Sequence, residues 1–328
     1  MRKLLFSLVF VFFFVILLSI LYLYKIDKNE LKEDFTASFY FWENSYNLDQ
    51  EVLEENKGLL YIKILDIKYS NRLEIIKTNF IKNPPKDFVP VIYITNKTFQ
   101  NIDYKDLVNK ILPFIKNNSF LNFSELQIDC DFSDSTKSNY FLFLEELKKE
   151  LNIVLSASIR LHQIKYFQKT GVPPVDYGLL MYYNMSNLAD FNTKNYILDN
   201  GEAKKYHYNF DKYPLKLKLA LPLYSQAVQF RDEKAINLFE GVFEDDFLEN
   251  FEKLENSRYK VLKSHYFKGK YIYKDDIFRL ETVKEDELKT AFNDFLKLSN
   301  NYFNEVVFYT IKYKNRYNLQ KLLQNSSN

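Results

Sequence analysis

The residues best suited to chemistry are two aspartates at alternate positions of one strand-like stretch. Asp129 and Asp131 follow Gln127 on one face of 126–132, and the opposite face of this stretch is apolar throughout. At that spacing their Cα atoms lie about 6.5–7 Å apart. Two like charges so close raise the pKa of one carboxyl group, so that it could hold a proton near neutral pH. Such a pair suits acid–base work on a bound substrate.

The next strand-like stretch, 153–161, adds a cation to the same pattern. Its polar face ends in Arg160, and His162 and Gln163 follow directly. An ion pair between Asp131 and Arg160, with His162 as a hydrogen-bonded partner, would serve packing alone, because buried pairs also occur without catalysis. The number of polar groups gathered here favours a functional site instead.

Other polar and aromatic residues stand at the ends of four further strand-like stretches. They are Trp42 and Glu43 after the first, Asp66 in the second, Tyr182, Tyr183 and Asn184 in the sixth, and Tyr224 in the seventh. Trp42 is the only tryptophan, and at a strand end it suits a platform on which a sugar ring stacks. An ordinary core position is the alternative for this residue.

Eight such stretches alternate with segments of helical spacing, and together they must position these side chains. Strands are expected at 38–42, 59–66, 89–95, 126–132, 153–161, 178–184, 217–224 and 305–313, and helices at 104–116, 140–151 and 285–298. Strands followed by helices in this order predict a parallel sheet, and eight such units predict an α/β fold, the closed (β/α)8 TIM barrel. Catalytic residues of such barrels lie at the carboxyl ends of the strands.

The segment between the seventh strand and the last helix is too long for a simple crossover. Alternating stretches at 259–261 and 270–273 predict a small α+β insertion at about 226–284. The barrel with its insertion is expected to span 37–328.

The N-terminus has the pattern of a targeting segment. Arg2 and Lys3 precede an apolar run at 4–24, which as a helix would be about 30 Å long, the thickness of a membrane's hydrocarbon core. Residues 1–25 are therefore expected to be a retained signal anchor or a cleaved signal peptide, followed by a linker at 26–36. Either would place the barrel outside the cytoplasm, in the cell envelope or secreted.

Composition excludes several classes of function. The chain has 45 Lys and Arg against 43 Asp and Glu, a net charge of +2, so a nucleic-acid partner is not expected. One cysteine, Cys130, excludes an intrachain disulfide and a cysteine-built zinc site. The three histidines do not have metal-ligand spacing, and there is no phosphate-binding glycine loop, so no metal or cofactor is expected.

The strand-end motifs resemble those of glycoside hydrolase family eighteen, the chitinases. In that family the fourth strand carries alternate acidic residues ending in a glutamate, the sixth reads Met-x-Tyr-Asp/Asn and the seventh Leu-Pro-x-Tyr. The matching segments here are 129–133, 181–184 and 221–224. The stretches 158–165 and 170–176 are closer still to an uncharacterised bacterial family of chitinase-like barrels. The resemblance implies a barrel that acts on or binds carbohydrate.

The resemblance assigns Asp131 and Tyr183 to stabilising positions but leaves the acid unmatched. Ser133 stands where the chitinases have their catalytic glutamate, and Leu126 stands at the first aspartate of the pattern. A glycosidase would therefore need a relocated acid, for which Glu43 and Asp129 are the candidates.

Two further hypotheses stay open at this stage. The first is a silent glycan-binding barrel, in which Trp42, Tyr182, Tyr183 and Tyr224 contact the sugar and Arg160 and His162 satisfy its hydroxyl or acidic groups. Asp66, Gln163 and Asn184 complete the expected binding set. The second is a glycosyltransferase with Asp129-x-Asp131 as its metal–nucleotide motif, which the missing doubly wound pattern disfavours.

Overall fold

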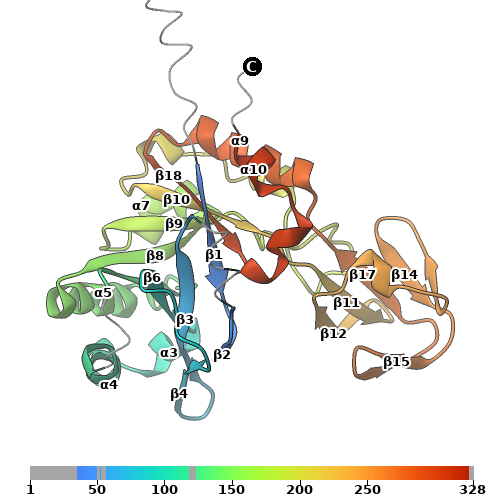
Figure 1. Cartoon of the computed structure of the whole chain (residues 1–328), viewed down its shortest axis with the longest axis horizontal. Coiled ribbons are helices and arrows are strands. Elements are labelled where there is room, and N and C mark those ends of the chain that lie inside the picture. Colours follow the sequence, from blue (N-terminus) through green and yellow to red (C-terminus); the bar gives the residue numbers. More distant parts are fainter. Residues whose placement is uncertain (1–34, 50–51, 53–56, 118–122, 325–328) are drawn as a thin grey trace, which may run out of the picture. The chain divides into compact units, whose positions relative to one another are not determined.

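The structure is a computed structural model that describes residues 35–49, 52, 57–117 and 123–324 (Figure 1). The expected targeting segment, 1–25, and nearly all of the linker lie outside these residues. Within the described ranges, no helix is long and apolar enough to cross a membrane. The signal anchor therefore stays a prediction.

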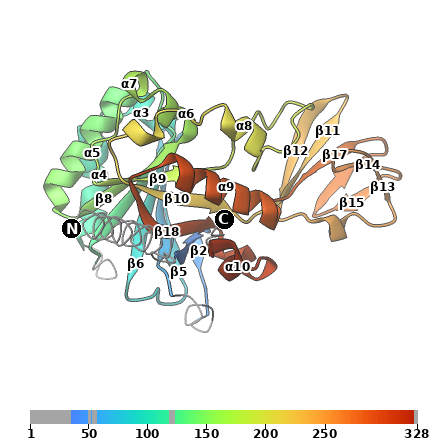
Figure 2. The ribbon, with the colours of Figure 1, turned by 90° about the horizontal axis from the view of Figure 1, so that it is seen from above.

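Eight parallel strands close into a barrel, which confirms the predicted TIM-barrel fold. They are β1 (Thr36–Phe41), β3 (Leu60–Tyr69), β6 (Phe88–Ile94), β7 (Glu125–Asp129), β8 (Val154–Arg160), β9 (Tyr177–Met181), β10 (Leu217–Pro222) and β18 (Tyr302–Tyr309). Each strand pairs with the next in the chain order of the barrel, and pairing of β1 with both β18 and β3 closes the ring (Figures 1 and 2).

Helices and short strands connect the barrel strands. The helices are α3 (Asn96–Asn101), α4 (Tyr104–Asn117), α5 (Lys137–Leu151), α6 (Leu161–Lys165), α7 (Phe167–Thr170), α8 (Asn200–Lys204), α9 (Glu285–Leu298) and α10 (Leu319–Leu323), with 3-10 turns at Phe210–Lys212, Glu244–Asp246 and Ile311–Arg316. Outside the barrel and the insertion, the short strands are β2 (Ser45–Tyr46), β4 (Leu73–Lys77) and β5 (Asn79–Phe80).

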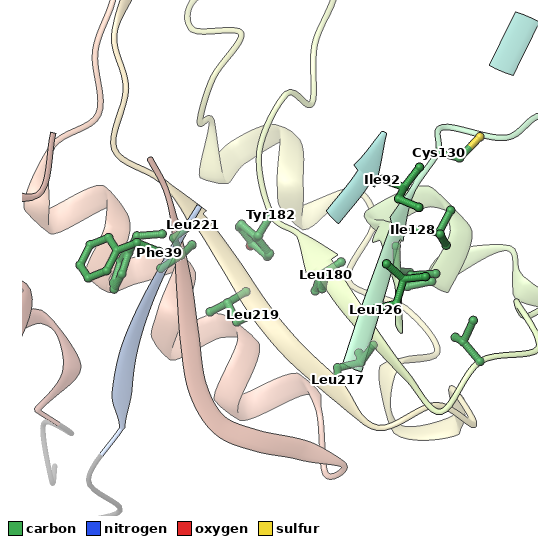
Figure 3. Packing of buried hydrophobic residues seen from close by; sticks show 14 of the residues in the cluster. Phe39, Ile92, Leu126, Ile128, Cys130, Leu180, Tyr182, Leu217, Leu219 and Leu221 are labelled. Carbon is green, nitrogen blue, oxygen red and sulfur yellow. The ribbon is translucent and has the colours of Figure 1, made fainter. Parts of the chain in front are cut away.

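The main hydrophobic core lies between the outer face of the barrel and the helices. The helices α4, α5 and α9 each bury one apolar face there, and α4 and α5 lie side by side (Figure 2). The barrel strands supply Leu126, Ile128 and Cys130 from β7 and its end, together with the alternate residues of their neighbours (Figure 3). The apolar face expected for the fourth strand is thus confirmed as the helix-facing side.

A buried polar network lies at the bottom of the barrel, at the amino ends of its strands, beside apolar residues such as Val89. The Lys218 ammonium lies 2.8 Å from a Glu305 carboxylate oxygen and donates a 2.7 Å hydrogen bond to the Tyr61 hydroxyl. Ser38 donates to the other Glu305 oxygen at 2.6 Å, and Tyr177 donates to Glu125. Polar groups at this end of a barrel contribute to stability rather than to chemistry, because the reactive end is the opposite one.

A β-bulge in β3 turns polar residues into the barrel. The register with β6 shifts between Lys63 and Leu65, so that Ile64 and Leu65 both belong to the helix-facing core. Lys63 and Asp66 then share the interior side, and both are almost fully buried. The second strand, expected to end at Asp66, continues to Tyr69.

The insertion after β10 is built of strands, which corrects the predicted α+β composition. Its sheet has the order β12-β11-β17-β14-β13, and a separate hairpin joins β15 to β16. The strands are β11 (Gln226–Arg231), β12 (Lys234–Glu240), β13 (Phe251–Lys253), β14 (Arg258–Val261), β15 (His265–Phe267), β16 (Lys270–Ile272) and β17 (Ile277–Glu281). The only helical element between 226 and 284, all of which is described, is one 3-10 turn, because alternating apolar residues pair into strands throughout.

We predict that Lys218→Met lowers the free energy of unfolding by about 3–5 kcal/mol, because it leaves the Glu305 carboxylate buried without its cation. Adding Glu305→Gln should recover part of that loss. Exposed Lys212 is the control, and Lys212→Met should change stability by less than about 0.5 kcal/mol. Denaturant unfolding of the full chain measures the free energy of unfolding of the parent, the two single variants and the double variant. A loss for Lys218→Met no greater than for Lys212→Met would show that the network does not support the barrel.

Candidate functional site

Asp129 is the last residue of β7 and lies half-buried at the carboxyl end of the barrel. Burial and the neighbouring Asp131 carboxylate raise the pKa of Asp129 to about 6, while a hydrogen bond with Ser158 acts in the opposite direction. The coupled pair expected from the spacing is therefore present, although Asp131 lies beyond the end of the strand. A carboxyl group with such a pKa keeps its proton in mildly acidic solution and can release it to a substrate.

Asp131 and Arg160 form an ion pair at the barrel mouth. The Arg160 Nε atom lies 3.3 Å from an Asp131 carboxylate oxygen. The Asp131 side chain is 64% exposed, whereas that of Arg160 is 21% exposed. Pairs with so much access to solvent contribute about 0–1 kcal/mol to stability. The pair therefore does little for the fold, and Asp131 remains open to a ligand.

A cavity of about 300 Å³ opens beside this ion pair. It is lined by Asp131, Phe132, Arg160, Leu161, His162, Gln163, Met181, Tyr183, Asn184, Met185 and Tyr206. Five of the residues proposed from the sequence thus line one cavity together with Asp131. Burial, together with the Arg160 charge, lowers the pKa of His162, so its imidazole is neutral at pH 7. The cavity offers hydrogen-bond donors and acceptors beside apolar surface, as sugar recognition requires.

Aromatic rings continue from this cavity across the mouth of the barrel. Tyr309 stacks on Tyr183 with ring centroids 5.8 Å apart and meets Trp42 at 5.7 Å and Tyr224 at 5.5 Å. Trp42 also contacts Tyr93 at 5.9 Å. Tyr93 is in register with Asp129 of the neighbouring strand, so Asp129 adjoins this cluster of rings. Burial, and then the charge of Asp129, raises the pKa of Tyr93 to about 12. Trp42 is half-buried and follows the end of β1.

Tyr93 and Tyr309 were not identified from the sequence, although strand alternation could have found both. Tyr93 shares a face with Val91 of β6, and Tyr309 shares one with Val307 of β18. Both valines belong to the inner core of the barrel. The same alternation therefore assigns the two tyrosines to the mouth.

Asn184 is held by its backbone and by a neighbour. It adopts a left-handed conformation with φ of 58°, which asparagine tolerates better than most residues. The Tyr224 hydroxyl donates a 2.5 Å hydrogen bond to its side-chain oxygen. The amide nitrogen of Asn184 is thereby left as the group that can face a ligand.

Tyr182, predicted as a binding residue, lies instead in the outer core. It is fully buried, and its hydroxyl is 2.7 Å from His207 Nε2 (Figure 3). The reason is alternation, because Tyr183 faces the barrel interior and its neighbour must face the helices.

Two other predicted residues have partners of their own. Glu43 is exposed and lies 3.5 Å from the Lys312 ammonium, and within the described residues no ion pair or hydrogen bond joins it to Asp129 or Asp131. Asp66 is buried inside the barrel, 2.9 Å from Lys68 and 3.6 Å from Lys63. Lys63 was not identified from the sequence. Its ammonium nitrogen lies 5.5 Å from the centroid of the Trp42 ring.

Ser133 belongs to the turn that precedes α5. Its backbone N–H donates to the Thr136 hydroxyl at 2.9 Å, and its own hydroxyl is 3.0 Å from that of Ser135 and 3.4 Å from the Asn96 side-chain oxygen. A hydroxyl in this network cannot protonate a leaving group at neutral pH. In the described part of the chain, no group of three or more potential ligands could hold a metal ion.

Comparison with known proteins gives similarity of structure only. No family model matches the sequence, and no curated protein matches it. The spore cortex-lytic enzyme SleL of Bacillus cereus superposes with a TM-score of 0.56 and 12% identity, over 89% of this chain and 74% of that one. A chitinase from Chromobacterium violaceum superposes with a TM-score of 0.52 and 9% identity, over 85% of this chain and 95% of that one. The chain has the chitinase-like TIM-barrel fold. The resemblance drawn from the strand-end motifs is thus confirmed for the fold.

We predict that Asp129 makes the protein less stable as pH rises. Its folded pKa of about 6 exceeds the ordinary value of 3.8, so folding favours the protonated form. This contribution is fully present below pH 4 and is lost as pH rises through 6, a change of up to about 3 kcal/mol. Asp129→Asn, which cannot ionise, should therefore gain stability relative to the parent between pH 4 and pH 7.

Denaturant unfolding of parent and Asp129→Asn at both pH values measures this difference. An equal difference at pH 4 and pH 7 would contradict the raised pKa. Exposed Asp211 supplies the control, since Asp211→Asn should show no such dependence.

Proposed function

We propose that the protein binds a glycan at the carboxyl end of its barrel and hydrolyses it, with Asp129 as the proton donor. The proposal rests on the position of Asp129 at the carboxyl end of β7, in register with Tyr93 of β6, where burial and the neighbouring Asp131 raise its pKa to about 6. A protonated carboxyl group can donate to the glycosidic oxygen as the leaving group departs. The Asp131 side chain, paired with Arg160, would stabilise the positive charge that develops on the sugar.

The rest of the mouth fits a sugar chain. The rings of Trp42, Tyr183 and Tyr309 offer surfaces for the apolar faces of sugar units. Asn184, Arg160 and the neutral His162 offer hydrogen bonds to hydroxyl groups. The two solved structures with the same fold carry names that refer to a chitinase and a cortex-lytic enzyme, and this supports a glycan as the ligand.

Silent glycan binding is the second candidate, and a specific observation favours it. Ser133 occupies the position of the chitinase glutamate and is engaged in the turn before α5. Glu43, the other candidate acid, is paired with Lys312. If Asp129 does not reach the glycosidic oxygen, the mouth retains every group needed for binding and lacks the acid.

The place of action follows from the N-terminal pattern. The cationic start and the apolar run at 4–24 support export and tethering to the membrane. We therefore propose a substrate in the cell envelope or outside the cell.

Hydrolysis is tested by counting new reducing ends released from chitin, peptidoglycan and other envelope polysaccharides. We expect Asp129→Asn and Asp131→Asn to lower the rate by about 10²–10⁴-fold, the usual contribution of an acid or a stabilising carboxylate. Glu43→Gln is the matched control and should keep the parental rate. A loss for Glu43→Gln equal to that for Asp129→Asn would make Glu43 the acid.

A parent that binds glycan without releasing reducing ends would support the silent barrel. In that case Ser133→Glu, which restores the chitinase residue, should create activity. No gain would show that more than the acid is missing.

The pH dependence gives a separate test of the proton donor. The rate should fall about tenfold per pH unit above pH 6, because Asp129 must be protonated. Ser158→Ala removes the hydrogen bond that lowers the pKa of Asp129. The falling limb of the pH–rate profile should therefore move to higher pH in this variant. If the falling limb of the profile does not move in Ser158→Ala, the group that must be protonated is not Asp129.

A further inference from the structure

The segment 185–198, called the mouth loop below, connects the end of β9 to α8 and contains neither helix nor strand. Its first residue, Met185, and the preceding Asn184 line the cavity beside the Asp131–Arg160 ion pair. A loop without regular structure keeps one shape only where other parts of the chain hold it. The shape of the cavity therefore depends on what holds the mouth loop.

The two ends of the mouth loop are bonded to each other. The backbone N–H of Asn184 donates a 2.8 Å hydrogen bond to the carbonyl oxygen of Ile197, and that of Met185 donates at 3.2 Å to the carbonyl oxygen of Tyr196. The positions of Asn184 and Met185 thus follow the position of residues 196–197.

The insertion holds this far end of the loop. The backbone N–H of Tyr196 donates a 3.1 Å hydrogen bond to the Glu281 carboxylate of β17, and the Asn195 side chain donates at 2.8 Å to the carbonyl oxygen of Thr282. Glu281 is fully buried, and its other oxygen accepts a 2.5 Å hydrogen bond from Gln226 of β11. Two strands of the insertion therefore fix the end of the loop to which Asn184 and Met185 are bonded.

Arg279, two residues before Glu281 on the same face of β17, holds the middle of the loop. Its side chain is 1% exposed, and its Nε atom lies 2.8 Å from the Glu281 carboxylate. The two terminal nitrogens of the guanidinium donate to the carbonyl oxygens of Asp190, at 2.6 Å, and Leu188, at 2.8 Å. One buried cation thus joins the insertion to the mouth loop at two places.

A buried ion pair is a poor device for stability alone, because apolar residues of similar volume often serve as well or better. The particular property of Arg279 is its planar fork, which bonds one carboxylate and two carbonyl oxygens at the same time. Neither a lysine nor an apolar residue can make this set of bonds. The contacts of the pair therefore favour a role in placing the loop.

We propose that Arg279 and Glu281 are positioning residues for the barrel mouth, which fix the mouth loop so that Asn184 and Met185 keep the cavity in its binding shape. The insertion then sets the affinity of a cavity that none of its own residues lines. Asp129 and Asp131 belong to β7 and its end, outside the loop, so the chemical step should depend on the pair much less than binding does. This inference rests on the proposed function, because the affinity in question is that for the glycan.

The double variant Arg279→Met/Glu281→Met separates placement from stability. It removes both charges together, so neither is left buried alone, and the flexible methionines can fill the space. The variant should remain folded, but its KM for a glycan should rise about tenfold while its kcat changes less than about twofold, because only binding groups are displaced. Arg279→Lys keeps a cation beside Glu281 without the fork, and it should raise KM by about threefold or more.

The probes are an N-acetylglucosamine tetramer and a peptidoglycan tetrasaccharide, each added to the full chain. Counting reducing ends gives KM and kcat, and calorimetry gives the Kd when the parent binds without hydrolysis. Hydrogen exchange followed by mass spectrometry reports on the loop itself. Peptides that cover 184–197 should exchange at least about tenfold faster in the double variant, whereas those of β7 and β8 should exchange as in the parent.

Another ion pair of the insertion supplies the matched control. The Arg231 Nε atom lies 2.7 Å from Asp276, which is 2% exposed. Within the described residues, no hydrogen bond joins this pair to the mouth loop. Arg231→Met/Asp276→Met should therefore keep the parental KM and the parental exchange of 184–197.

Each outcome decides the proposal. Parental KM or Kd, or parental exchange of the loop, in Arg279→Met/Glu281→Met would overturn it and leave the proposed function intact. An equal loss in the Arg231 and Asp276 control, or a fall in kcat at unchanged KM, would also overturn it. If the double variant does not fold, Arg279→Lys decides by the same measurements. A parent that neither binds nor cleaves either probe would overturn the proposed function, and the positioning role with it.

Discussion

The structure depends on one constraint: a polar side chain that points into the barrel costs folding free energy unless it finds a partner there. Alternation along each strand sends half of its residues inward, and several of these are polar. At the bottom, Lys218 and Glu305 satisfy one another. In the middle, the Tyr40 hydroxyl donates a 2.6 Å hydrogen bond to the Gln127 side-chain oxygen. Such networks are costly when incomplete, so the pairing of these polar groups supports the lower barrel.

The mouth differs because its charged groups are more open to solvent than those at the bottom. Asp131 forms an exposed ion pair with Arg160. The Asp129 carboxyl group, by contrast, is buried close to the like charge of Asp131, and both effects raise its pKa. Within the described residues, Gln163 has one buried side-chain donor without a partner, as has Gln127 in the barrel interior. A buried carboxyl group and an unpaired buried donor both cost folding free energy.

Alternation predicted much of this arrangement, and its failures have physical reasons. It separated the polar from the apolar faces of β7 and β8, but it was not applied to the sixth strand, where it places Tyr183 inside and Tyr182 outside. Lys218 escaped notice because it is the only charged residue of β10. Lys63 shares β3 with Asp66 and Lys68, and the bulge that puts Lys63 and Asp66 on the same side is not visible in the pattern. The bulge at Ile64 cannot be seen in the sequence, and neither can the pairing of Glu43 with Lys312, which depends on contacts between distant parts of the chain.

The central claim is that the barrel mouth holds a carboxyl group that stays protonated to about pH 6 beside a charged one. The most direct measurement is a pH titration of the Asp129 carboxyl carbon by NMR in the labelled full chain, alone and with Asp131→Asn. The account predicts a midpoint near pH 6 that falls when the neighbouring charge is removed. A midpoint near the ordinary value of 3.8, unchanged in the variant, would contradict it.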